Sequence, residues 1–227
     1  MGSSDMRADF PFHVSAVLFD LDGTLVNSTA AVDRHTRLWA DRCGLDPEWT
    51  IAATRGIADE EFIPRLVPHR DPEAELAWLT ALSCRDTEGI RPVPGADRTL
   101  DRLPPRRWGV VTAAARTVAA ARIAAAGLPE PPLLLTAEDV GSGKPDPEGY
   151  LKGAAALGVP PADCLVFEDS PTGRRAGADA GMTVVAVGAP PHDMEVPHLR
   201  DFTEAAVSTS ADGRLVLARR HRRGSRI

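Results

Sequence analysis

The stretch AVLFDLDGTLV, residues 16–26, decides the fold of this chain. Its first four residues are apolar and predict a buried strand, and Gly23 marks a turn soon after it. Between the strand and the turn lie Asp20 and Asp22, separated by one leucine. Side chains alternate along an extended chain, so both carboxylates point to the same side. Because a carboxylate is costly to bury without a partner, we expect a counter-charge at the end of this strand.

The composition is typical of a globular protein without a nucleic-acid or membrane partner. The chain has 227 residues, of which 43% are hydrophobic and 26% charged, enough for one large core or a core with a smaller second unit. Its formal net charge of -6 argues against nucleic-acid binding, which usually needs a basic domain. No apolar run approaches the ~18 residues of a membrane span. The N-terminus lacks the features of a secretion signal, and three widely spaced cysteines suit reduced thiols, so we expect a cytoplasmic protein.

Apolar periodicity predicts one helical segment followed by alternating strands and helices. Helical patterns fill residues 29–92, so we expect a helical insert after the first strand. Later apolar runs predict strands at 108–113, 132–137, 164–169 and 183–188. Strands that alternate with helices of about a dozen residues indicate a parallel sheet covered on both faces. The sequence therefore predicts an α/β fold, a doubly wound parallel-sheet core with an inserted helical domain.

The same patterns suggest domain boundaries. We expect the α/β core to comprise residues 13–28 and 93–218, with the helical insert at 29–92 between them. Residues 1–12 are polar and aperiodic and predict a disordered lead-in, while the basic residues 219–227 predict a solvated tail.

The predicted strands end in side chains that suit phosphate chemistry. These are carboxylates and a hydroxyl: Asp20, Asp22, Thr112, Glu168 and Asp169. The loop GSGKPDP adds Lys144, one of only two lysines among 26 basic residues. Ligands of doubly wound sheets bind beyond the carboxyl ends of the strands, so we expect one shared cleft. Grouped carboxylates need a counter-charge, and Mg²⁺, which prefers oxygen ligands and often binds carboxylates together with phosphate, is the natural candidate. The six histidines and three cysteines show no ligand spacing for a softer metal.

Four segments carry a resemblance to a known family: FDLDGTLV, VVTA, GKPDPEGY and LVFEDSPTGRRAG. In order and spacing they resemble the motifs of the haloacid dehalogenase-like (HAD) hydrolases, from about residue 14 over nearly the whole chain. The insert resembles the small helical cap of the phosphoglucomutase-like branch, and other stretches are similar to the glycerol-3-phosphatase and 2-deoxyglucose-6-phosphatase group. The resemblance implies a Mg²⁺-dependent phosphatase for a small sugar or polyol phosphate. We expect a monomer, with a dimer as the alternative.

The resemblance also implies roles for the residues of the predicted cleft. It makes Asp20 the nucleophile that forms an aspartyl-phosphate. Asp22 becomes the general acid for the leaving group and then the general base for water. Mg²⁺ would be bound by the Asp20 side chain, the Asp22 carbonyl and Asp169, with Glu168 as a further or water-mediated ligand. Lys144 would supply a compact positive charge near Asp20.

The remaining residues of the motifs imply substrate contacts. Thr112 and the Ala113 amide would bind phosphate oxygens, with Gly23 and Ala114 beside them. The family usually has serine at the position of Ala113, so this chain lacks one hydroxyl there. Arg55 is the candidate for a substrate contact from the cap, and a solvated arginine at a helix end is the alternative.

Three other classes of protein use similar residues and are alternatives to a phosphatase. A β-phosphoglucomutase uses a cap histidine ten residues beyond the acid–base aspartate, where this chain has Val32, with His35 one turn further on. The mutase also has an arginine where this chain has Asp59, so both departures favour a phosphatase. A C–halogen hydrolase would lack the second aspartate. A phospho-receiver signalling module uses similar residues, but it is about half this size and has no cap.

Overall fold

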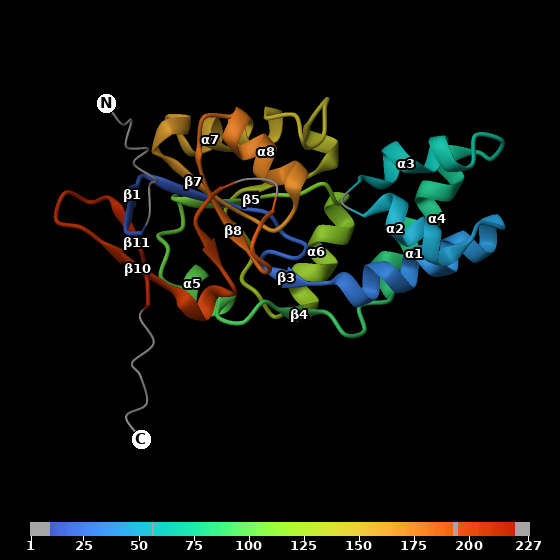
Figure 1. The fold of residues 1–227 in the computed structure, drawn as a ribbon, viewed down its shortest axis with the longest axis horizontal. Coiled ribbons are helices and arrows are strands. Elements are labelled where there is room, and N and C mark those ends of the chain that lie inside the picture. Colours follow the sequence, from blue (N-terminus) through green and yellow to red (C-terminus); the bar gives the residue numbers. More distant parts are fainter. Residues whose placement is uncertain (1–9, 56, 193–194, 221–227) are drawn as a thin grey trace, which may run out of the picture.

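The computed structural model describes residues 10–55, 57–192 and 195–220. A sheet lies at its centre (Figure 1). This sheet is parallel and has six strands in the order β6-β5-β2-β7-β8-β9. The strands are β2 (Ala16–Phe19), β5 (Trp108–Val111), β6 (Leu134–Leu135), β7 (Cys164–Glu168), β8 (Thr183–Val187) and β9 (His198–Leu199). Strands β5 and β6 lie on one side of β2, and β7, β8 and β9 lie on the other. This arrangement confirms the predicted α/β fold, and β2 lies at the switch point where such sheets bind ligands.

The central strand β2 is covered on both faces. Four helices pack on the sheet: α5 (Ala96–Leu100), α6 (Arg116–Ala125), α7 (Glu148–Leu157) and α8 (Pro171–Asp179). Val17 and Phe19 belong to a large apolar cluster with α5 and α6, whereas Ala16 and Leu18 pack with α7 and α8. All four side chains are fully buried. The residues that follow β2 are therefore held by a strand fixed from both sides.

A helical unit with its own core is inserted between two short strands, β3 (Val26–Asn27) and β4 (Arg91–Pro92). Its helices are α1 (Thr29–Cys43), α2 (Pro47–Thr54), α3 (Asp59–Leu66) and α4 (Pro72–Arg85). Asp46 and Asp71, each directly before a proline, cap α2 and α4 by accepting hydrogen bonds from backbone N–H groups in the first turn of the helix. Trp39 and Phe62 meet edge to face inside this core. Strands β3 and β4 pair antiparallel, so the two connections to the sheet run side by side.

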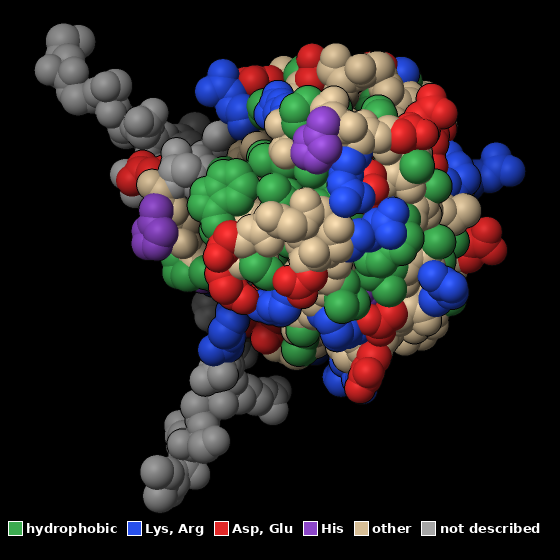
Figure 2. All heavy atoms as spheres, turned by 90° about the vertical axis from the view of Figure 1, so that its right-hand side faces the viewer, with side chains coloured by type: hydrophobic (Ala, Val, Ile, Leu, Met, Phe, Trp, Pro, Cys, Tyr) green, Lys and Arg blue, Asp and Glu red, His purple; other side chains and the backbone are tan. Residues whose placement is uncertain are grey.

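The helical unit lies beyond one end of the sheet (Figure 1). Viewed from that side, acidic and basic side chains are intermixed over the surface (Figure 2). Exposed ion pairs such as Arg37–Glu48 and Arg65–Glu61 belong to this unit, and pairs of this kind contribute little to stability. Among the described residues, no helix has both the length and the apolar character needed to cross a membrane.

A second sheet corrects two of the predicted boundaries. It has the order β1-β11-β10, formed by β1 (Phe12–Val14), β10 (Ala205–Thr209) and β11 (Leu215–Arg219). Phe12, expected in a disordered lead-in, begins β1 because it pairs with Leu217 and is buried. Arg219, expected in the tail, is the last residue of β11 and pairs with Ala205. Residues 1–9 and 221–227, the rest of the expected lead-in and tail, lie outside the described residues.

Short 3₁₀ helices complete the connections between these elements. They are η1 (Ala137–Asp139), η2 (Pro161–Asp163) and η3 (Phe202–Glu204). The first of them follows β6 at the edge of the sheet where the site lies, and Thr136 and Asp139 close it with a reciprocal capping box.

Candidate active site

Asp20 leaves the end of β2 into a tight turn. Its backbone N–H donates to the Phe167 carbonyl on the neighbouring β7 (3.0 Å), which keeps the chain in register one residue beyond the strand. Gly23 then has a φ of +89°, and a Cβ built there would lie 2.0 Å from Asp169 Oδ2. The turn therefore requires glycine both for its backbone conformation and for the close approach of Asp169.

Lys144 joins the acidic groups of two strands. Its Nζ lies 2.6 Å from Asp20 Oδ1 and 2.6 Å from Glu168 Oε1, and it also donates to the Val111 carbonyl at 3.0 Å. These acceptors use the three donors of one ammonium group. A guanidinium is larger and planar and would not fit this compact arrangement. The geometry explains why a lysine stands here in a chain whose other basic residues are almost all arginine.

Glu168 is fully buried and both of its oxygens are engaged. Oε1 accepts from Lys144 and from the Tyr150 hydroxyl at 3.0 Å. Oε2 accepts from the backbone N–H and the hydroxyl of Ser170, each at 3.0 Å. Glu168 therefore fixes Lys144 and the loop after β7. Tyr150 and Ser170 are not among the predicted site residues, although both lie inside the quoted motifs.

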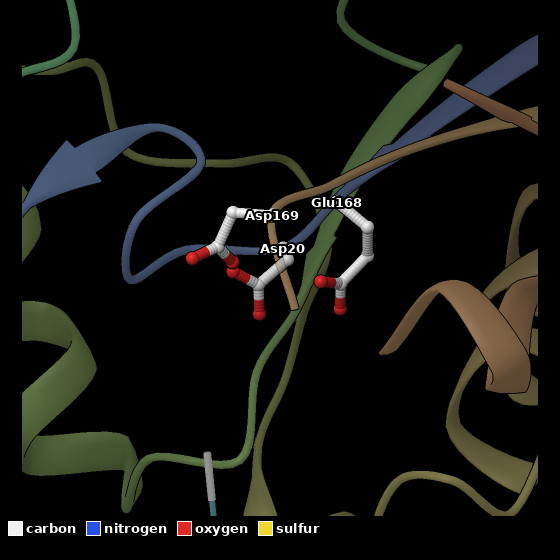
Figure 3. Close-up of side chains that lie close together, drawn as sticks. All are labelled: Asp20, Glu168 and Asp169. Carbon is white, nitrogen blue, oxygen red and sulfur yellow. The ribbon is translucent and has the colours of Figure 1, made fainter. Parts of the chain in front are cut away.

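The carboxylates of Asp20, Glu168 and Asp169 form one acidic cluster (Figure 3). One oxygen from each lies within 4.8 Å of the others. Burial raises the pKa of Asp20 well above its ordinary value, even though Lys144 opposes this shift. Burial and the nearby Glu168 raise the pKa of Asp169 to about 7. One ammonium group thus leaves the cluster short of positive charge, and its all-oxygen donor set suits a hard divalent cation.

Thr112 and the two alanines after it form the loop beyond β5. The Thr112 hydroxyl is buried and accepts from the Ala114 N–H at 3.1 Å. The Thr112 N–H donates to the Leu135 carbonyl of β6. This leaves the loop open to the same space as Asp20 and Lys144, where Thr112, Ala113 and Ala114 line a cavity.

This cavity, of about 480 Å³, lies between the sheet and the helical unit. Its lining includes every predicted site residue except Glu168: Asp20, Asp22, Gly23, Arg55, Thr112, Ala113, Ala114, Lys144 and Asp169. Glu168 does not line it, because its side chain is directed into the protein and fully buried. A second cavity of about 480 Å³ adjoins the first across Thr112 and Lys144. The space is large enough for a phosphate with a small organic group attached.

Arg55 and the first turn of α3 form the wall that the helical unit contributes. The Arg55 side chain is 58% exposed and is paired with Asp33 at 3.1 Å. Asp59, Glu60 and Glu61 also line the cavity. Burial, with the neighbouring Glu60, raises the pKa of Asp59 to about 6. Asp59 is not a predicted site residue and distinguishes the sequence only from the mutases; its place in the cavity follows from the position of α3.

Asp22 has two partners that the sequence analysis did not identify. Ser28 donates to Asp22 Oδ1 at 2.5 Å, and Arg122 Nη1 donates to Asp22 Oδ2 at 2.6 Å. Arg122 projects from α6 and is buried, with 8% of its surface exposed. One signal was available: Arg122 lies four residues after Val118 and three after Ala119, on the buried face of its helix.

Comparisons with known proteins agree with this geometry. The family model described as haloacid dehalogenase-like hydrolase matches residues 14–181. Hexitol phosphatase A of Escherichia coli is 43% identical over 178 residues, covering 76% of this chain and 82% of that protein. Glycerol-1-phosphate phosphohydrolase 2 of Saccharomyces cerevisiae is 33% identical, covering 77% of this chain and 74% of that protein.

A solved structure extends the likeness to the fold of a mutase. The crystal structure of β-phosphoglucomutase from Clostridium difficile superposes with a TM-score of 0.62 at 22% identity, covering 78% of this chain and 85% of that one. At this level of identity the likeness concerns the fold alone.

Proposed function

Because this chain belongs to the haloacid dehalogenase-like hydrolases, we propose that it is a phosphatase that hydrolyses a small sugar or polyol phosphate. One observation carries the proposal: Asp20, bound by Lys144, shares a cavity with Asp22 and with the Thr112 loop. The named substrates of similar phosphatases, a hexitol phosphate and glycerol 1-phosphate, support the substrate class.

Asp20 and Asp22 divide the reaction into two displacements. In the first, a carboxylate oxygen of Asp20 attacks phosphorus, the bond from phosphorus to the leaving oxygen breaks, and Asp22 gives a proton to the departing alkoxide. In the second, water attacks the phosphorus of the aspartyl-phosphate, Asp22 takes a proton from that water, and the bond to Asp20 breaks. Phosphate leaves, and both carboxyl groups return to their starting states.

The residues around Asp20 supply charge and orientation. Lys144 holds Asp20 through Oδ1, and the Thr112 hydroxyl with the Ala113 amide would bind phosphate oxygens. Uncatalysed hydrolysis of phosphate monoesters calls for accelerations of up to ~10²¹-fold. One acid–base group supplies only about 10²–10⁴-fold. Fixed charges and positioning must therefore provide most of the remainder.

The acidic cluster fits a Mg²⁺ ion. Asp20 and Asp169 offer carboxylate oxygens, and the Asp22 carbonyl is the third ligand that we propose. Glu168 would contribute through water, because both of its oxygens already accept hydrogen bonds. When bound, the ion would neutralise the acidic groups and allow a dianionic phosphate to approach.

Two features oppose the mutase alternative. His35 does not line the cavity: its Nε2 contacts Asp86 at 3.1 Å and its Nδ1 contacts Ser83 at 3.2 Å, and burial lowers its pKa. Val32, at the position of the mutase histidine, lines the cavity from this helix together with Thr29, Asp33 and Thr36. No proton donor therefore stands where a mutase has its cap histidine.

The function can be tested by phosphate release from a panel of phosphorylated metabolites in the presence of Mg²⁺. We expect sugar and polyol phosphates to be the best substrates and Asp20→Asn to be inactive while still folded. Asp97→Asn, an exposed aspartate on α5, is the matched control. After an acid quench, the wild type should carry one phosphoryl group on the peptide that contains Asp20. Full turnover by Asp20→Asn would refute the assignment of the nucleophile.

A further inference from the structure

Arg122 is a buried cation that the reaction described above does not use. It lies in the second turn of α6, the helix that begins directly after the Thr112 loop. Its side chain is 10% exposed, and its ion pair is with Asp22 at 2.6 Å. Removing a guanidinium from water is costly unless an anion pairs with it. The burial of Arg122 is thus linked to the carboxylate that we propose as the acid–base group.

The contacts of Asp22 fix the plane of its carboxylate. Ser28, the N-cap residue of α1, binds Oδ1, and Arg122 of α6 binds Oδ2. With one partner the group could rotate about its terminal torsion, since such torsions are broad and weakly restrained. With two partners on different oxygens it is held in one orientation beside Asp20.

The two partners also differ in what they can bind. A guanidinium only donates, whereas a serine hydroxyl can either donate or accept. Oδ2 therefore stays an acceptor for Arg122 in both halves of the reaction. A proton on the carboxyl group is better accommodated on Oδ1, where the Ser28 hydroxyl can turn and accept.

Arg122 also has donor capacity that packing does not use. Its Nε is buried and has no hydrogen-bond partner among the described residues. An unpaired buried donor costs roughly 1–3 kcal/mol, which is unfavourable for a residue that serves stability alone. Arg122 lines the cavity together with Asp22 and Asp59.

We propose that Arg122 is a positioning residue that holds Asp22 so that Oδ1 faces the leaving-group oxygen. The proposal rests on the role of Asp22 in the proposed function. Its effect should depend on how much the leaving group needs a proton. An alkoxide leaving group needs one, whereas p-nitrophenolate is stable enough to leave as the anion.

The test compares kcat/KM for glycerol phosphate and for p-nitrophenyl phosphate, because kcat/KM covers the steps up to loss of the leaving group. For Arg122→Met we expect a loss of about 10²-fold with glycerol phosphate and less than about tenfold with p-nitrophenyl phosphate. Arg122→Lys should recover part of the kcat/KM that Arg122→Met loses with glycerol phosphate. Arg116→Met, on the same helix but exposed and paired with Asp139, is the matched control and should change neither value.

Equal losses on both substrates, or no loss on either, would overturn the role of Arg122. If Arg122→Met fails to fold, as judged by its melting curve, the test uses Arg122→Lys instead. The deciding quantity is then the loss of kcat/KM with glycerol phosphate relative to the loss with p-nitrophenyl phosphate. Asp22→Asn separates this result from the proposed function. If Asp22→Asn does not lower kcat/KM for glycerol phosphate more than kcat/KM for p-nitrophenyl phosphate, the role of Asp22 is wrong. If the wild type hydrolyses neither compound nor any other phosphate ester, the proposed function itself fails.

Discussion

Replacing Lys144 by methionine removes the counter-charge of the buried carboxylates while keeping the length of the side chain. Its Nζ lies 2.6 Å from both Asp20 and Glu168, and the Lys144 side chain is only 11% exposed. Breaking a buried ion pair from one side destabilises a protein by about 3–5 kcal/mol. For a chain of this size, each kcal/mol lowers the melting temperature by ~2–4 °C. We therefore expect Lys144→Met to melt roughly 6–20 °C below the wild type.

The stability lost in Lys144→Met should depend on pH, and the pKa of Asp20 determines whether the loss grows toward acid or toward alkaline pH. Burial already raises the pKa of Asp20, and Lys144 limits that rise. Without Lys144, the folded protein gains more by binding a proton at Asp20 than the unfolded chain does. Stability then falls as the pH increases, since the folded state holds the extra proton. The difference in free energy of unfolding between Lys144→Met and the wild type should be smaller at pH 5 than at pH 8.

Thermal and urea denaturation in EDTA, at both pH values, measure this effect without a cation that could replace the lysine. Lys152→Met is the matched control, because Lys152 is the other lysine of the chain and its side chain is 48% exposed in an ion pair with Glu148. We expect the control to change stability by less than about 1 kcal/mol. A loss in Lys144→Met no larger than in the control, or one that grows toward acid pH, would refute this account of the site.

Three further predictions concern the same cavity. Mg²⁺ at a hundred times its Kd should stabilise the wild type by about 2.7 kcal/mol, and Asp169→Asn should abolish most of this shift in a thermal melt. Gly23→Ala should lose both Mg²⁺ stabilisation and phosphatase activity, because its Cβ would lie 2.0 Å from Asp169 Oδ2; wild-type activity would contradict the turn geometry. The pKa of Asp59 is about 6 in the folded protein against 3.8 ordinarily, so its contribution to stability decreases as pH rises through this window. Asp59→Asn should therefore be more stable than the wild type at pH 7, by at most about 3 kcal/mol, and the advantage should vanish near pH 4 in urea titrations.

The sequence predicted the residues whose positions depend on the strand order alone. Asp20, Thr112 and Asp169 each follow an apolar run, and a parallel sheet brings the ends of such runs to one edge. Lys144 could be predicted as well, because the motif around it resembles a known family and arginine is the usual basic residue of this chain.

The contacts that depend on helix packing could not be predicted. Arg122 reaches Asp22 across 100 positions of sequence, and this requires the rotational setting of α6 against the sheet. The buried hydrogen bonds of Glu168 depend in the same way on how α7 places Tyr150.

Strand β1 was missed for a different reason. With 3 residues it is too short to show alternation, and its partner β11 lies near the other end of the chain, where Phe12 pairs with Leu217. Only the folded structure brings these two segments together.

The side-by-side pairing of β3 and β4 constrains how the helical unit could move relative to the sheet. Both chain connections between the sheet and the helical unit pass through this two-stranded ribbon, β3 and β4. A rotation of the helical unit relative to the sheet would therefore have its axis at the ribbon, next to Ser28. Ser28 sits at that axis and also contacts Asp22. We therefore expect a rotation of the helical unit about this ribbon to move Ser28 relative to Asp22, so that opening of the cavity and the orientation of Asp22 would change together.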